Sequence, residues 1–226
     1  MFWVPDLSKK SMETIFTSIL KGFLNPSGQD IAMFATHIIK GSVDIYQYTI
    51  KSFLPTPTKC HYTFNLRDLS KVVQGMLEMS TDDIADKDVL VQLWVHETFR
   101  VFRDRLVSDQ DKDKFNKQVH KVMEQYLQIE WPLEDYKDLL FGDIERGDGT
   151  YFRLSDINTL IKELDLKLDA YNAENSSQMN LVFFSDCVSH LSRIARILRQ
   201  QRGNALLVGV GGSGRRSMAT LGAYIN

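Results

Sequence analysis

Asn-Ala-Leu-Leu-Val-Gly-Val-Gly-Gly-Ser-Gly-Arg-Arg-Ser, residues 204–217, is the stretch that decides the fold of this chain. Its apolar run Ala205–Val208 predicts a short buried strand, and residues 215–225 predict a helix. Between them lies a loop that contains the glycines Gly209, Gly211, Gly212 and Gly214. Glycines allow successive backbone N–H groups to turn toward an anion, and the start of a helix adds partial positive charge. The stretch therefore predicts a cradle for a phosphate group.

The cradle is a variant of the P-loop fingerprint G-x-x-x-x-G-K-[S/T]. Gly209 and Gly214 have the required spacing, but Arg215 takes the lysine position and Arg216 the hydroxyl position. Arginine keeps the positive charge and presents a wider, planar group. Ser217 comes one residue late, which on a helix is a rotation of about 100°. Because the hydroxyl ordinarily helps to hold Mg²⁺, we expect Mg²⁺ binding to be weakened by Arg216.

We predict a site for ATP or ADP that suits nucleotide binding better than hydrolysis. Its residues are Gly209, Gly211, Gly212, Ser213, Gly214, Arg215, Arg216 and Ser217. Only Met218–Asn226 follow, whereas a P-loop strand is buried in a parallel sheet that needs several further strand–helix units. The expected fold is therefore the first part, a strand, P-loop and helix, of an incomplete α/β P-loop domain. We assign no catalytic residue, and whether the chain is an enzyme stays open.

Composition restricts the classes of partner. The chain has 226 residues, of which 43% are hydrophobic and 25% are charged, as in soluble globular proteins. A formal net charge of -2 argues against a nucleic-acid partner. No run approaches the roughly 18 apolar residues of a membrane span, and no signal peptide is apparent. We therefore expect a cytoplasmic protein without a membrane partner, with Cys60 and Cys187 as free thiols.

Helical spacing of apolar residues dominates the rest of the chain. It predicts helices at about residues 8–24, 29–54, 65–77, 87–106, 109–127, 154–174 and 181–200. Met1–Val4 predicts the end of a strand. Glycines, aspartates and a proline across residues 130–149 predict an irregular connector, so we place a domain boundary near residue 150. The predicted fold is mainly α: a helical bundle in residues 1–150, then a strand, P-loop and helix within residues 151–226.

Two short patterns suggest metal sites, and both are rejected. His96-Glu97 begins the zinc motif H-E-x-x-H, but Arg100 occupies the second histidine position. The acidic run from Asp143 suggests a calcium loop, but lacks the glycine and glutamate that such a loop requires at its sixth and twelfth positions. No resident metal is therefore assigned.

Arg67 lies in the first turn of a helix that Asn65 is expected to cap. From this position an arginine could reach a phosphate across a domain junction. The alternative is a surface arginine in the first helical turn, and the residues themselves leave both interpretations open.

Several segments together resemble the motor ring of dynein heavy chains. Residues 62–75, Tyr-Thr-Phe-Asn-Leu-Arg-Asp-Leu-Ser-Lys-Val-Val-Gln-Gly, resemble the helical lid of the third AAA+ module of the ring. Residues 94–106, Trp-Val-His-Glu-Thr-Phe-Arg-Val-Phe-Arg-Asp-Arg-Leu, resemble the continuation of that lid. Residues 180–186 and 190–198 look like the lead-in to the fourth module. Residues 209–215 are similar to its P-loop in axonemal dyneins, where arginine in place of lysine also occurs.

This resemblance implies specific roles. Arg67 matches the second sensor arginine of the third module, and Val182 lies where residues flank the adenine of the fourth site. The implied role is ATP or ADP binding and structural coupling between modules in microtubule-based ciliary motility. The implied partners are other AAA+ modules or dynein subunits, and microtubules only through the full-length protein. The implied location is the cytoskeleton of the ciliary axoneme.

Two other functions stay open. The chain could be a P-loop nucleotidase whose site is completed by another subunit. It could also be a helical interaction protein whose glycine loop binds no ligand.

Overall fold

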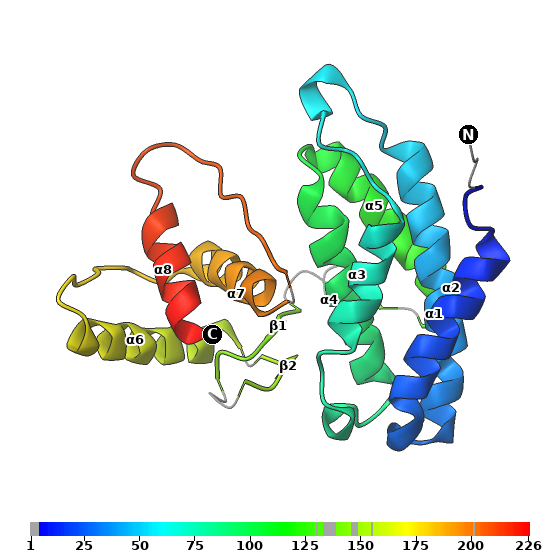
Figure 1. Ribbon diagram of the computed structural model, residues 1–226, viewed down its shortest axis with the longest axis horizontal. Coiled ribbons are helices and arrows are strands. Elements are labelled where there is room, and N and C mark those ends of the chain that lie inside the picture. Colours follow the sequence, from blue (N-terminus) through cyan, green and yellow to red (C-terminus); the bar gives the residue numbers. More distant parts are fainter. Residues whose placement is uncertain (1–4, 130, 133–138, 146–148, 155, 201) are drawn as a thin grey trace. The chain divides into compact units, whose positions relative to one another are not determined.

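The computed structural model describes residues 5–129, 131–132, 139–145, 149–154, 156–200 and 202–226. Within these ranges the chain forms eight α-helices and one two-stranded sheet (Figure 1). The predicted mainly α fold is confirmed. The chain divides into two compact units, Met1–Asp138 and Leu139–Asn226. The strand predicted at Met1–Val4 lies outside the described residues.

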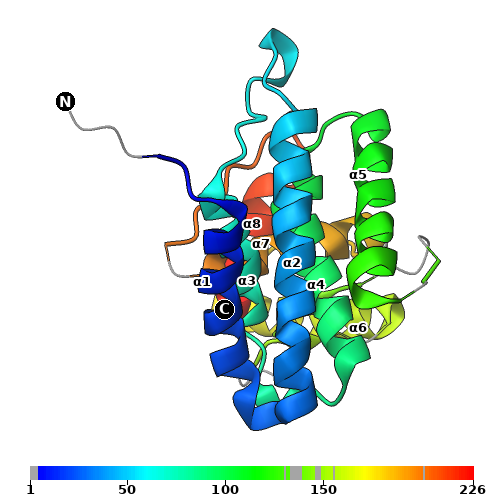
Figure 2. The ribbon, with the colours of Figure 1, turned by 90° about the vertical axis from the view of Figure 1, so that its right-hand side faces the viewer.

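The described residues of the first unit form a bundle of five α-helices. Consecutive helices α1 and α2 lie side by side (Figures 1 and 2). The helices are α1 (Lys9–Leu24), α2 (Gln29–Ser52), α3 (Leu66–Met76), α4 (Lys87–Val101) and α5 (Asp109–Val122). Short 3₁₀ turns occupy Asn25–Ser27, Pro57–Lys59, Thr81–Asp83 and Arg103–Arg105, and a π-helical turn, Met123–Leu127, continues α5. The predicted helices at 87–106 and 109–127 therefore each end in a turn of different geometry.

Local sequence explains where these helices begin. The side chains of Ser8, Asp86 and Ser108 each accept a backbone N–H of the following turn. Asn65 and Asp68 form a reciprocal capping box at the start of α3, as the sequence predicted for Asn65. Each capping side chain satisfies a donor that the helix itself leaves unpaired.

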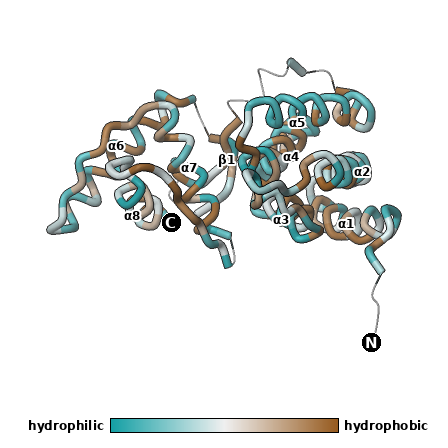
Figure 3. Tube along the Cα trace, turned by 90° about the horizontal axis from the view of Figure 1, so that it is seen from above, coloured by the Kyte–Doolittle hydropathy of each residue, from teal (hydrophilic) through white to brown (hydrophobic). Residues whose placement is uncertain are grey.

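Helix α4 is the core of this unit. Trp94 is fully buried, and its indole Nε1 donates to Ser42 Oγ on α2 at 2.7 Å. His96 and Glu97 are buried as well, so the start of the apparent zinc motif is core. In contrast, α5 is mostly hydrophilic (Figure 3) and buries only a narrow stripe that includes Phe115 and Val119. A helix covered on all sides is the expected centre of a bundle.

In the second unit, the residues that the structure describes form a small hairpin and three helices. Strands β1 (Phe141–Gly142) and β2 (Phe152–Arg153) pair in antiparallel fashion, with Phe141 opposite Arg153. The helices are α6 (Ile157–Glu174), α7 (Ser185–Arg199) and α8 (Arg215–Ile225). Helix α6 begins later than predicted because the Asp156 carboxylate accepts the backbone N–H of Asn158 at 2.8 Å.

The boundary between the units lies earlier than the expected position near residue 150. Ile144, Phe152 and Leu154 pack in one core with residues of α6 and α7. Strand β1, which lies within the predicted connector, is therefore part of the β1–β2 hairpin of the second unit. Its strands are too short to give a recognisable alternation in the sequence.

The predicted strand at Ala205–Val208 is not formed. These residues have no regular secondary structure, and Leu206 and Val208 are 90% and 85% exposed. The prediction of a buried strand was therefore wrong for this structure. A strand is stable only when it pairs with a neighbour, and no strand among the described residues pairs with this segment.

A carboxylate ties α5 to the segment before α3. Asp111 accepts hydrogen bonds from Tyr62 Oη at 3.0 Å and from Lys59 Nζ, and Tyr62 Oη accepts the backbone N–H of Val107 at 2.9 Å. Burial acts to raise the pKa of Asp111, but the hydrogen bonds from Lys59, Ser108 and Tyr62 outweigh it and hold that pKa below its usual value. The ionised form is therefore the stabilising one.

We expect Asp111→Asn to lower the free energy of unfolding at pH 7 by about 1–3 kcal/mol, because its partners lose a charged acceptor. A lowered folded-state pKa contributes stability that is present above about pH 4 and is lost as the pH falls through that pKa. Urea unfolding of wild type at successive pH values should show this loss, and the variant should show a flatter profile. Parallel profiles would contradict the prediction. Asp113→Asn, at an exposed position on the same helix, is the control.

Gly75 lies where α3 meets α4. A Cβ atom there would lie 1.8 Å from Oε2 and 3.0 Å from Cγ of the fully buried Glu97. We expect Gly75→Ala to destabilise the protein by roughly 1–3 kcal/mol through overpacking. Gly22→Ala on α1 meets no atom within 4 Å, so the same substitution there should leave stability unchanged or raise it. Equal thermal unfolding temperatures for the two variants would contradict this.

Candidate nucleotide-binding site

Helix α8, which carries the glycine-rich loop at its start, packs closely against α7. Leu221 and Gly222 are buried. A Cβ atom at Gly222 would lie 2.9 Å from Ile194 Cγ2 and 3.5 Å from Leu191 Cδ1. Only glycine permits this close approach, so Gly222 fixes the distance between the two helices.

Side-chain contacts further along α8 complete its attachment. Met218 Sδ lies 4.0 Å from Cys187 Sγ, and burial raises the pKa of that thiol. The ring of Tyr224 meets Tyr171 edge to face at 5.2 Å between centroids, and its hydroxyl donates to Glu174 Oε2 at 3.0 Å. Both α6 and α7 therefore hold α8 in place.

The loop itself has the backbone conformation that the glycines predict. Gly212 and Gly214 have φ values of 80° and 71°, in the left-handed region that disfavours side chains. Cβ atoms built at Gly211, Gly212 or Gly214 would meet nothing within 4 Å, so the backbone at these positions is open to approach. Gly214 is also the N-cap of α8, and no described side chain caps its amides. The helix start can therefore offer its N–H groups to an anion.

Arg215 folds back over the loop. Its Nη2 donates to the Val210 carbonyl at 3.0 Å, and its Cδ and Nε lie 3.5 Å and 3.7 Å from the position of a Cβ at Gly209. The Ser213 backbone N–H donates to the same carbonyl at 3.4 Å. These contacts bring Ser213 and Arg215 close to Gly209. The guanidinium is thereby placed beside the cradle.

The donor set fits a phosphate better than a metal ion. Open glycine amides, an uncapped helix start and two arginines all favour a negative charge. Mg²⁺ requires oxygen ligands in near-octahedral geometry, and the residue at the position of the usual hydroxyl ligand is Arg216, which is exposed. Ser217 is half-buried in the next position of the helix. The residues present therefore fit a nucleotide phosphate and do not reproduce the usual magnesium ligand.

The other two predicted site residues lie outside the loop. Val182, 79% exposed, belongs to the same unit and lies in the segment before α7, whereas the next residue, Phe183, is buried in the core. Arg67 belongs to the first unit. It is exposed in the first turn of α3, and its backbone N–H donates to Asn65 Oδ1 at 2.9 Å.

Arg105 is a residue that the sequence analysis did not identify. Its guanidinium pairs with Asp68 Oδ1 at 3.0 Å, donates to the carbonyls of His61 and Thr63 at 3.1 and 2.9 Å, and lies 4.4 Å from the ring centroid of Phe64. It therefore holds the turn from which Arg67 projects. No local pattern marks it, because its partners lie far away in the sequence.

The residues that resemble metal sites in the sequence have structural roles. Asp143, the first residue of the rejected calcium loop, is buried and accepts a hydrogen bond from Arg199 Nη1 at 2.7 Å. Asp148, a later member of that loop, lies outside the described residues. In the part of the chain that the structure describes, no group of three or more His, Cys, Asp or Glu side chains could hold a metal ion.

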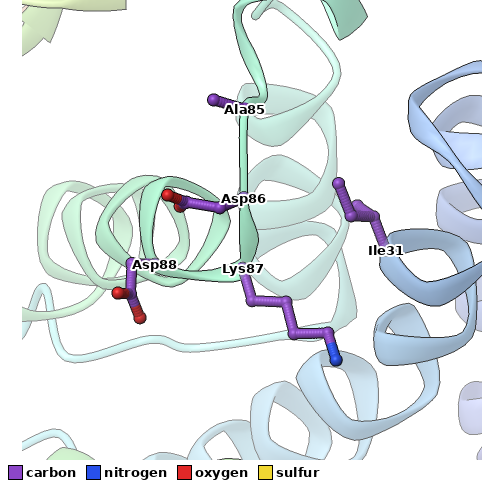
Figure 4. Close-up of a pocket in the computed structure, with 5 residues that line it drawn as sticks. All are labelled: Ile31, Ala85, Asp86, Lys87 and Asp88. Atoms are coloured by element: carbon purple, nitrogen blue, oxygen red, sulfur yellow. The ribbon is translucent and has the colours of Figure 1, made fainter.

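A surface pocket occurs at the start of α4 (Figure 4). Ile31, Ala85, Asp86, Lys87 and Asp88 line it. Asp86 already accepts the Val89 N–H as the cap of α4, so the pocket is a feature of helix capping in the first unit. None of the described helices combines the length and apolar character of a membrane span.

Comparison with known proteins agrees with the order of the two units. Residues 15–112 match the family described as dynein heavy chain, ATPase lid domain. Residues 179–226 match the P-loop containing dynein motor region D4. The chain belongs to the dynein heavy chain family.

Individual relatives support this assignment. The chain is 41% identical to human dynein axonemal heavy chain 6 over 232 residues, with 100% of the chain covered. It is 38% identical to human dynein axonemal heavy chain 12 and 36% identical to human dynein axonemal heavy chain 1, with 96% and 97% of the chain covered. The chain spans only 6–8% of the lengths of these relatives. It therefore corresponds to a small part of a dynein heavy chain.

We expect Gly222→Val to displace α8 from α7, because the added side chain would overlap Ile194. Hydrogen–deuterium exchange should show faster exchange of the amides of α8, while the helices of the first unit keep their protection. Gly211→Val is the matched control, since that position has open space and an unstrained φ. Unchanged exchange in α8 of the Gly222 variant would contradict the prediction.

Proposed function

We propose that this chain binds ATP or ADP at its glycine-rich loop and structurally couples two successive AAA+ modules of a dynein motor ring. One observation carries the proposal. The lid-domain match and the P-loop match occur in this order on one chain, and the second includes the open loop at the start of α8. In this interpretation the first unit is a helical lid, and the second unit is the N-terminal part of the next AAA+ module.

The loop chemistry supports binding without hydrolysis by the chain alone. Arg215 supplies the positive charge of the fingerprint lysine, and its contact with Val210 holds the guanidinium beside the cradle. Arg216 replaces the hydroxyl that would normally help to hold Mg²⁺. We assign Gly209, Gly211, Gly212, Ser213, Gly214 and Ser217 to the same site, and Val182 to its adenine side.

Arg67 is the proposed link between the lid and a nucleotide. It is exposed in the first turn of a well-capped helix, and Arg105 and Asp68 hold that turn. An exposed arginine on a fixed backbone is suited to contact a phosphate. Movement of the lid with nucleotide state would then pass to the following unit along the chain.

The wider setting follows from the relatives, whose names place them in the axoneme. We propose that the protein acts in microtubule-based ciliary motility, with other AAA+ modules or dynein subunits as its partners. Contact with microtubules would be made through the whole heavy chain.

Isothermal titration calorimetry of the 226-residue chain with ADP and with ATP tests the nucleotide site. We expect saturable binding that Arg215→Ala weakens by about tenfold or more, because a hydrogen bond to a charged group contributes roughly 1.5–3 kcal/mol. Arg153→Ala removes the same charge from an exposed position on β2 and should bind as wild type does. Absence of binding by wild type would favour a helical interaction protein instead. Equal losses in both variants would indicate only a general effect of charge.

A further inference from the structure

We infer that the glycine loop of this chain takes the nucleotide phosphates as a metal-free anion, with Arg215 and Arg216 neutralising charge where other P-loops use Mg²⁺. The inference rests on the proposed nucleotide site and specifies the form of ligand that the site accepts. Three features of the loop and of α8 support it.

The first feature is the fixed position of one cation. Arg215 donates to the Val210 carbonyl at 3.0 Å, and its Cδ would lie only 3.5 Å from a Cβ atom at Gly209. Its guanidinium retains further N–H donors and stays charged at all accessible pH values. A phosphate that enters the loop therefore meets a positive charge already placed beside it.

The second feature is the identity of the next residue. Arg216 occupies the position from which a serine or threonine hydroxyl would coordinate Mg²⁺ in the fingerprint. A guanidinium has five N–H donors and no acceptor, so it cannot ligate a cation. Because Arg216 is exposed, its side chain is sterically able to turn toward a bound phosphate.

The third feature is the direction of the nearest hydroxyl on the helix. Ser217 follows Arg216 on a continuous α-helix, so it is rotated by about 100° from the fingerprint position. Gly222 fixes α8 against Ile194, which leaves little freedom for the helix to rotate and bring that hydroxyl back. A divalent cation at the loop would also be repelled by two guanidinium groups.

Calorimetry with ADP in EDTA and in millimolar Mg²⁺ tests this inference. We expect binding in EDTA to be as tight as in Mg²⁺ or tighter, since Mg²⁺ sequesters the free nucleotide that the site prefers. If Mg²⁺ tightens ADP binding by more than about threefold, the inference is overturned, whereas the proposed nucleotide site is retained. This threshold is smaller than a tenfold change in affinity, which corresponds to about 1.4 kcal/mol. No binding under either condition would overturn both.

Arg216→Ser restores the fingerprint hydroxyl at an exposed position, so it should fold and should gain affinity for ADP when Mg²⁺ is added. Arg216→Ala removes the same charge without supplying a ligand, and its affinity should not rise with Mg²⁺. Gain of a magnesium effect in the serine variant alone would support the assignment to Arg216. A serine variant that is as indifferent to Mg²⁺ as wild type, or an alanine variant with the same gain, would overturn it.

Discussion

The close contact between Gly222 on α8 and Ile194 on α7 is the constraint on which the candidate site depends. The glycine-rich loop has few contacts of its own, and its orientation follows from the helix that it precedes. A Cβ atom at Gly222 would already be 2.9 Å from Ile194 Cγ2, so a side chain there would push the helix and its N-terminus away. The amides and Arg215 are thus placed by packing two turns further along α8.

A comparable dependence exists in the first unit. Arg67 is exposed, yet the turn that presents it is held by Asp68, which caps α3 and pairs with Arg105 at 3.0 Å. Arg105 in turn lies against the ring of Phe64 and donates to two backbone carbonyls. An exposed candidate residue is therefore positioned by buried and half-buried neighbours, as precise placement of an arginine requires.

The sequence predicted the helices well and the strands poorly, for a physical reason. Each helix satisfies its own backbone hydrogen bonds, so the stripe of Phe115 and Val119 and caps such as Asn65 identify α5 and α3 locally. A strand depends on a partner: Ala205–Val208 has none among the described residues, while the two-residue strands β1 and β2 pair without a visible pattern. The loop glycines were predictable because left-handed φ values are a local requirement. Arg105 was not, since its contacts are long-range.

This difference between local and long-range requirements also bears on how the site would work. On the helix side the loop is fixed, with Gly212 and Gly214 already in left-handed conformations and Arg215 bound to Val210. At the other end of the loop and in the segment before it, Leu206, Val208 and Val210 are at least 80% exposed. A phosphate would thus be held first by donors at the start of α8, which need little ordering. Any strand that later paired with residues 205–210 would fix the other side of the loop, and by linkage that pairing and nucleotide binding would strengthen each other.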